Sequence, residues 1–125
     1  AVHDGVGAHV GGAIAGRVLR FRDEVMITAA GERLKVPHMG WSRVRQVRPH
    51  PLWRGIDDGA RFYFAHSYHP VPDDPAVTVG TADYPAPFTC AIARDNIFAT
   101  QFHPEKSQRA GLALLANFVT WDGCP

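Results

Sequence analysis

The sequence predicts a β-rich portion of an α/β domain that is closed by one helix near its C-terminal end. Three observations lead to this prediction. Short runs of β-branched and aromatic residues, separated by Gly, Pro and Asp, recur along most of the chain. Apolar residues at helical spacing appear once, near the end of the sequence. The alternation of strands and helices that marks a complete α/β domain is absent from the sequence.

The composition is that of one small globular domain. The chain has 125 residues, of which 46% are hydrophobic and 20% charged, and its formal net charge is +1. The 13 Lys and Arg residues are scattered, which argues against a nucleic-acid partner. No apolar run approaches the roughly 18 residues that a bilayer requires, so no membrane partner is expected. Two cysteines make no disulfide framework, and the expected compartment is the cytoplasm.

The first half of the chain alternates turn-rich segments with short strands. Residues 1–15 are glycine-rich, show neither a helical nor a strand period, and are expected to be irregular. A strand is expected at 16–21, followed by a hairpin over 25–36 that turns near residues 30–31. Residues 42–60 contain several Pro, Gly and Asp and are predicted to form a loop.

The second half of the chain contains the clearer strands. An aromatic-rich strand is expected at 60–68, ending before Pro70 because proline cannot donate to a strand ladder. Residues 76–84 form another strand candidate. A hairpin is expected over 88–102, with a three-residue connection at 94–96.

A single amphipathic helix is predicted to run from about Gln108 to Trp121. Ser107 stands where a helix N-cap belongs. The apolar face is expected from four residues at helical spacing, Leu112, Leu115, Phe118 and Val119.

The segment "FHPEKS" carries the strongest chemical signal. Proline disfavours helical backbone at the preceding residue, so His103 is expected to be extended at the end of its strand. In extended backbone, residues two apart point to one side, which lets Glu105 approach the imidazole. A histidine oriented by a carboxylate is the base of a nucleophilic triad. The alternative is a surface His–Glu pair without function.

No convincing nucleophile accompanies this pair. Cys90 alternates with Phe88 and Ile92 in mid-strand, which indicates a buried apolar residue. Cys124 lies close to the end of the chain, where fraying is expected. Neither has the accessible, electropositive surroundings of a catalytic thiol.

Three segments together resemble a known family. They are "KVPHMGW" (35–41), "YFAHSY" (63–68) and "IARDNIFATQFHPEKSQRAGLALLANF" (92–118). They resemble the C-terminal part of the glutaminase subunit of imidazole glycerol phosphate synthase, a class I glutamine amidotransferase. The resemblance runs from about Gly11 to Trp121 and implies part of a flavodoxin-like α/β domain.

The resemblance implies roles for the His–Pro–Glu pair. His103 and Glu105 correspond to the second and third members of a catalytic triad. The first member is a cysteine in a Gly-x-Cys-x-Gly elbow upstream of the matching region, and this sequence contains no such motif. The chain is therefore interpreted as a fragment of a normal glutaminase, which by itself is expected to be inactive and to expose a sheet edge that favours aggregation.

The resemblance also implies a glutamine-binding role for Ser67 and Tyr68. The alternative is a strand end at which the tyrosine packs and the serine caps a turn. His66 is expected to be a hydrogen-bonded structural histidine. His66 and His69 are spaced for a metal, but no further ligand completes a set, so no metal site is predicted.

A partner interface is expected at "PHMGW". Pro37, Met39, Gly40 and Trp41 combine a rigid turn with large apolar side chains typical of interface anchors. The resemblance places this loop, with Lys106, against a cyclase subunit. Ser42 stands where the family usually has asparagine, so the resemblance does not establish one of the interface hydrogen bonds.

The function implied is glutamine hydrolysis and transfer of ammonia to a cyclase subunit, which makes imidazole glycerol phosphate and aminoimidazole carboxamide ribotide during histidine biosynthesis. The expected assembly is a heterodimer, and no cofactor is expected. Two alternatives stay open: a non-catalytic fragment that docks on the cyclase, and the glutaminase domain of another amidotransferase such as anthranilate or GMP synthase.

Overall fold

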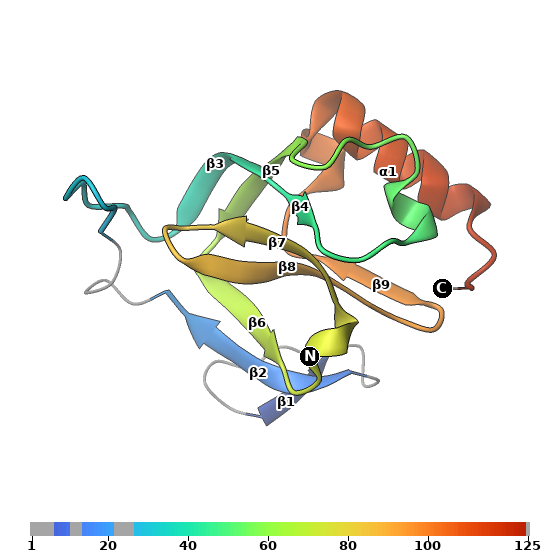
Figure 1. The fold of residues 1–125 in the computed structure, drawn as a ribbon, viewed down its shortest axis with the longest axis horizontal. Coiled ribbons are helices and arrows are strands. Elements are labelled where there is room, and N and C mark those ends of the chain that lie inside the picture. The colour runs from blue at the N-terminus through green and yellow to red at the C-terminus, as the bar shows by residue number, and fades with distance from the viewer. Residues whose placement is uncertain (1–6, 11–13, 22–26, 125) are drawn as a thin grey trace.

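The computed structural model describes residues 7–10, 14–21 and 27–124, and these form a β-rich chain with one α-helix at its C-terminal end (Figure 1). The strands are β1 Gly7–Val10, β2 Ile14–Arg20, β3 His38–Arg43, β4 Arg45–Gln46, β5 Arg61–His66, β6 Tyr68–Pro72, β7 Thr78–Asp83, β8 Pro87–Arg94 and β9 Ile97–Thr100. The helices are the short 3-10 turns η2 Pro51–Trp53, η3 Pro75–Val77 and η4 Pro104–Lys106, and the α-helix α1 Gln108–Thr120. The expected β-rich chain closed by one helix is confirmed.

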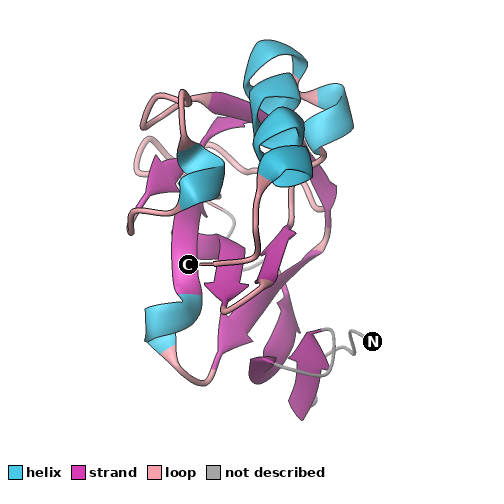
Figure 2. Ribbon diagram, turned by 90° about the vertical axis from the view of Figure 1, so that its right-hand side faces the viewer, coloured by secondary structure: helices cyan, strands magenta, loops and turns pink. Residues whose placement is uncertain are grey.

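The strands form three antiparallel sheets, ordered β1-β2-β6, β3-β5 and β4-β7-β8-β9. Helix α1 packs against η2, η4 and β5. Figure 2 shows α1 at one end of the molecule and the N-terminal strands at the other. None of the helices in the described part of the chain combines the length and apolarity that a membrane crossing needs.

An aromatic core joins these sheets. On β5 the side chains alternate, so that Phe62 and Phe64 are buried while their neighbours face outward. Phe64 contacts Phe88 on β8 and Phe102 beyond β9, with ring centroids 5.9 and 5.7 Å apart. Leu114 of α1 is buried in the same cluster. The core therefore fixes β5, the β8–β9 hairpin and α1 relative to one another.

Several expected strands are confirmed, and the start of the chain is more ordered than expected. Strand β2 covers most of the strand expected at 16–21. The hairpin turn near residues 30–31 is confirmed by the bridge between Ile27 and Arg33, although residues 22–26 lie outside the described residues. Within the start expected to be irregular, residues 7–10 form β1 and pair with β2.

Strand β6 contradicts the expectation that the chain leaves the sheet before Pro70. Pro70 and Pro72 lie opposite Val18 and Gly16 of β2. The hydrogen bonds to β2 are made by the residues that alternate with these prolines. One of them is the 3.0 Å bond from the Asp73 N–H to the Ala15 carbonyl. Since β6 is an edge strand, both proline nitrogens face away from β2 and no donor is lost.

Two further boundaries differ from the sequence-based expectation. The predicted loop 42–60 contains the end of β3, the short strand β4 and η2, because β3 pairs with β5 through Arg43. The β8–β9 connection has two residues rather than three, because Arg94 pairs with Ile97. Asp95 adopts a φ of 52°, which short polar residues tolerate in tight turns.

Helix α1 is confirmed, but its expected apolar face is not buried. Gly111 and Leu114 are the buried positions. The four residues expected to form the apolar face are exposed: Leu112 by 66%, Leu115 by 39%, Phe118 by 54% and Val119 by 80%. The side chain of Ser107 does not cap the helix. The helix is apolar on most of its circumference, so periodicity alone could not distinguish which side the described core covers.

Two histidines lie inside the aromatic core. His38 of β3 and His66 of β5 are 2% and 7% exposed, and their rings are joined by a 2.9 Å hydrogen bond. Burial lowers the pKa of His38 to about 4, with a smaller contribution from His66. Burial also lowers the pKa of His66, although its bond to the Tyr68 carbonyl opposes this shift. Both imidazoles are therefore neutral at pH 7.

We predict that replacing Gly111 with alanine destabilises the fold. A Cβ at this position would collide with the carbonyl oxygen of Pro104 and lie 2.8 Å from Ser107 Cβ. Overpacking of about 1–3 kcal/mol should outweigh the roughly 1 kcal/mol that alanine gains over glycine in a helix. The free energy of unfolding, measured by denaturant titration, should fall. Leu112→Ala, an exposed change in the same turn, is the control, and a stabilised Gly111→Ala variant would contradict the prediction.

We also predict an acid-sensitive fold. Between pH 6.5 and 4 the unfolded chain binds a proton at His38 that the folded chain excludes. The contribution of His38 to the free energy of unfolding is therefore fully present above pH 6.5. It declines by roughly 2–3 kcal/mol as the pH falls towards 4. Denaturant titrations from pH 7.5 to 4 should show this decline in the parent chain and a shallower one in His38→Gln. Val44→Ala, which weakens the core without changing a titratable group, should keep the parent slope.

Candidate functional site

His103 stands at the point where the β9 segment meets the helical end of the molecule. It follows Phe102, which is buried in the core, and precedes Pro104, the first residue of η4. Its backbone is extended, with φ −101° and ψ 99°, as the following proline requires. Its Nδ1 lies 3.0 Å from Glu105 Oε1. The expected His–Glu contact is therefore present.

The backbone of His103 is held from two sides. Its N–H donates to the Tyr63 carbonyl of β5 at 2.9 Å. Its carbonyl accepts from the Ser107 hydroxyl at 2.6 Å, and the same hydroxyl accepts from the Tyr63 N–H at 2.9 Å. Ser107 is 1% exposed, so water does not compete for these bonds. The imidazole consequently projects from a rigid backbone.

The side chains of this pair remain accessible. Those of His103 and Glu105 are 37% and 59% exposed. Since a carboxylate only accepts, Nδ1 of His103 donates to Glu105 and Nε2 carries the lone pair. Within the described residues, Nε2 has no hydrogen-bond partner. The pKa of Glu105 is lowered by a backbone hydrogen bond and by its bond to His103, so the carboxylate stays charged. This arrangement suits a general base that takes a proton at Nε2.

Neither cysteine can serve this base. Cys90 is 1% exposed, and burial raises its pKa to about 12, which confirms its expected role as an apolar core residue. Cys124 follows α1 while His103 precedes it, and a 13-residue helix of about 20 Å lies between them. The carbonyl of Cys124 accepts from Trp121 Nε1 at 2.6 Å.

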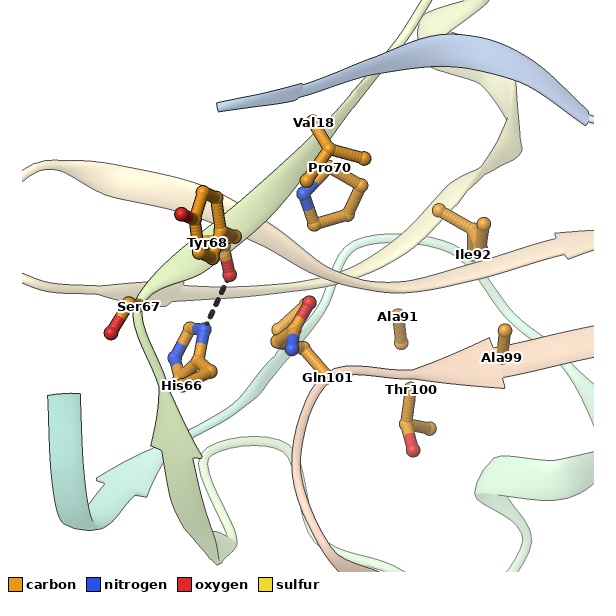
Figure 3. Close-up of a pocket in the computed structure, with 11 residues that line it drawn as sticks. Val18, His66, Ser67, Tyr68, Pro70, Ala91, Ile92, Ala99, Thr100 and Gln101 are labelled. Atoms are coloured by element: carbon orange, nitrogen blue, oxygen red, sulfur yellow. Dashed lines mark hydrogen bonds between the residues drawn. The ribbon is translucent and has the colours of Figure 1, made fainter. Parts of the chain in front are cut away.

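An open cavity of about 620 Å³ lies between β6 and the β8–β9 hairpin (Figure 3). Ser67 and Tyr68, the residues expected to bind glutamine, both line it. Gln101, which precedes His103 by two residues in the sequence, also lines the cavity and is labelled in Figure 3. The remaining lining residues are Val18, His66, Pro70, Cys90, Ala91, Ile92, Ala99 and Thr100. The cavity is thus mostly apolar with a few polar groups along the β6 and β9 ends.

Most residues expected at a partner interface are exposed, but Met39, Gly40 and Trp41 lie on strand β3 rather than on a loop. Met39 and Trp41 occupy alternate positions of β3 and are 62% and 45% exposed. Gly40 lies between them with a φ of 130°, and Pro37 and Lys106 are also exposed. The Pro and Gly of this segment indicated a turn, but residues His38–Arg43 form a strand because they pair with β5.

Strand β5 connects this exposed face to His103. The ring of Trp41 contacts that of Tyr63, with centroids 5.8 Å apart. The backbone of Tyr63 bonds both His103 and Ser107. Ser42 does not face outward with Trp41, since its hydroxyl lies 2.9 Å from His38 Nε2. The Ser42 hydroxyl is therefore engaged inside the protein.

Three residues that the sequence analysis did not select contribute to the site. Ser107 fixes the His103 carbonyl, Gly111 allows α1 to approach Pro104, and Gln101 lines the cavity. Of these three, only Gly111 could have been found from the sequence. A glycine inside a helix lowers helix stability, so its presence indicates that another segment packs closely there.

Comparison with known proteins assigns the family. The family described as "Glutamine amidotransferase class-I" matches residues 6–121. The protein named imidazole glycerol phosphate synthase subunit HisH of Dechloromonas aromatica is 64% identical over 110 residues, covering 88% of this chain and 51% of its own length. The HisH of Thiobacillus denitrificans is 60% identical over 111 residues, covering 89% and 49%. The chain thus spans about half the length of the curated relatives it matches.

A solved structure supports the fold. A putative GMP synthase protein from Thermoplasma acidophilum superposes with a TM-score of 0.61 at 17% identity, covering 83% of this chain and 47% of that one. The match along most of the sequence, together with the His–Glu pair at the end of the β9 segment, shows that this chain belongs to the class I glutamine amidotransferase family.

Proposed function

We propose that this chain supplies the histidine and glutamate of a glutaminase site in imidazole glycerol phosphate synthase. The observation that carries the proposal is the bond between His103 and Glu105, held on a fixed backbone with Nε2 directed away from the carboxylate. The relatives named HisH, at 54–64% identity, support the choice of this subunit over other members of the family.

The chemistry requires a cysteine from the portion of the relatives' length that this chain does not span. Its thiolate attacks the amide carbon of glutamine and forms a thioester as ammonia leaves. His103 first takes the proton of the cysteine thiol at Nε2, gives it to the leaving nitrogen, and then takes one from the water that hydrolyses the thioester to glutamate. Glu105 holds the ring orientation and stabilises the imidazolium between these steps. No step uses a metal or redox cofactor.

Ser67 and Tyr68 are the proposed glutamine contacts. They line the cavity together with Thr100 at the end of β9 and Gln101, which precedes His103 by two residues. A polar edge on an otherwise apolar pocket suits a substrate whose reacting amide must be oriented.

The proposed partner is the cyclase subunit, in a heterodimer located in the cytoplasm. Pro37, Met39, Gly40 and Trp41 give an exposed apolar surface on β3, and Lys106 adds a charge beside His103. Docking of the partner against this surface would shield ammonia from water and keep it unprotonated for ring closure.

A non-catalytic docking fragment is the second candidate. The described part of the chain offers no suitable thiol, which favours this candidate if the chain acts without the other half of the domain. The two candidates share the interface on β3 and differ in glutamine hydrolysis.

The rest of the domain is proposed to cover the exposed side of α1. This side carries Leu112, Leu115, Phe118 and Val119, and a helix that is apolar on most sides is normally buried. Strand β9 also has only β8 as a neighbour within the described residues, which leaves an edge available for pairing.

We predict that a chimera restores glutamine hydrolysis. The chimera has two parts: the segment of the Dechloromonas aromatica HisH that this chain does not match, and residues 14–125 of this chain. It is assayed with the cyclase of that organism. Glu105→Gln should lower kcat by about 10²-fold or more because the base loses its orienting charge, and His103→Asn should abolish hydrolysis. Glu32→Gln, an exposed change on the 27–33 hairpin, should leave the rate unchanged. A chimera that binds the cyclase but does not release ammonia would favour the docking fragment.

We predict that charge on α1 prevents association of the two halves when they are expressed as separate chains. Val119→Glu combined with Leu115→Glu should abolish co-purification, because two carboxylates would be buried against apolar surface. Arg109→Glu changes charge in the first turn of the same helix, about 9 Å or more along the axis from Leu115 and Val119, and should leave co-purification intact. If the double glutamate variant and Arg109→Glu co-purify equally well, the other half binds a surface other than this side of α1.

A further inference from the structure

Three hydrogen bonds form a continuous chain through the core from Ser42 to Tyr68. The Ser42 hydroxyl lies 2.9 Å from His38 Nε2, and His38 Nδ1 lies 2.9 Å from His66 Nε2. His66 Nδ1 then reaches the Tyr68 carbonyl at 2.7 Å, the contact drawn as a dashed line in Figure 3. The chain therefore links β3, β5 and the start of β6.

The direction of this chain is fixed at one end. A carbonyl oxygen can only accept, so His66 carries its proton on Nδ1 and presents a lone pair at Nε2. His38 must then donate from Nδ1, and its Nε2 accepts from the Ser42 hydroxyl. Because both imidazoles are neutral, each ring donates once and accepts once, and each has a single tautomer.

The surrounding aromatic rings hold both imidazoles in place. His38 stacks between Tyr84 and Phe64, at centroid distances of 3.9 and 4.8 Å. Phe21 meets His38 and His66 edge-on, at 6.4 and 5.2 Å. With the rings fixed in this way, a shift of one strand is passed to the next through the bonds between them.

The two ends of the chain lie at the two surfaces assigned above. Ser42 is half-buried and neighbours the exposed Trp41 of β3. The Tyr68 carbonyl belongs to the residue that lines the cavity beside Ser67. A displacement of β3 would thus change the last hydrogen bond at the cavity.

We propose that His38 and His66 are positioning residues that couple the β3 surface to the backbone of Ser67 and Tyr68. The link itself is independent of the proposed function, whereas its effect on glutamine rests on that function. The coupling has a physical form: occupation of the β3 surface moves Ser42, and the two imidazoles transmit this movement to the Tyr68 carbonyl.

Nuclear magnetic resonance of the ¹⁵N-labelled and ¹³C-labelled chain tests the link directly. We expect one protonated nitrogen in each imidazole, Nδ1 in both, and a scalar coupling across the N–H···N bond between His38 and His66. Ser42→Ala, a change at the edge of the core, should shift the ring nitrogens of His38 and His66 and the carbonyl carbon of Tyr68. Arg43→Ala, on the outward side of β3, should leave these signals unchanged.

A protonated Nε2 in His66, or a Tyr68 carbonyl that does not respond to Ser42→Ala, would overturn the proposal. His38→Gln is a second variant, which should also remove the scalar coupling and shift the Tyr68 carbonyl. Because Ser42→Ala spares the buried rings, misfolding of His38→Gln would not decide the outcome.

The effect on substrate is measured in the chimera with its cyclase. Ser42→Ala should raise the KM for glutamine by about fivefold while changing kcat less than about twofold, because positioning of bound glutamine is affected and the reacting groups are not. An unchanged KM beside a shifted Tyr68 carbonyl would overturn the coupling to glutamine. A chimera without any hydrolysis would instead count against the proposed function, and the magnetic resonance result would still decide the link.

Discussion

The buried hydroxyl of Ser107 is the contact on which the candidate site depends. It donates to the His103 carbonyl and accepts from the Tyr63 N–H, so one side chain joins β5, the start of η4 and α1. Without it, the Tyr63 N–H would lack a partner, at a cost of about 1–3 kcal/mol, and the His103 carbonyl would keep only its 3.1 Å bond from the Lys106 N–H. The close approach of Gly111 to Pro104 serves the same arrangement, since it brings α1 near enough for Ser107 to reach β5.

The Ser107 contact makes the backbone of His103 rigid and leaves its side chain accessible. The backbone of His103 is fixed from both sides, while its imidazole and the Glu105 carboxylate remain open to solvent. A proton-transfer group needs both properties, because its nitrogen must be held in place and must still meet a reacting partner. The core supplies the rigidity through Phe102 and the neighbouring aromatic rings, and the helical turn at Pro104 directs the side chain outward.

The distribution of apolar surface is consistent with the length of the match to relatives. The exposed side of α1, the apolar cavity and the one-sided pairing of β9 within the described residues leave apolar surface and a strand edge open. The chain spans about half the length of its curated relatives, so a second half of comparable size is available in those proteins to cover them.

The sequence by itself determined the features that depend on near neighbours. Proline after His103 imposed extended backbone, the spacing of two brought Glu105 to the imidazole, and alternation placed Cys90 in the core. Only the tertiary structure decided which side of α1 is buried, that Ser107 serves β5 rather than capping the helix, and that the β6 prolines sit on an edge. It also paired His38 with His66 across 28 residues. Local patterns report on residues a few positions apart, whereas these outcomes depend on partners from distant segments, which compete for the same side chains only after the chain has folded.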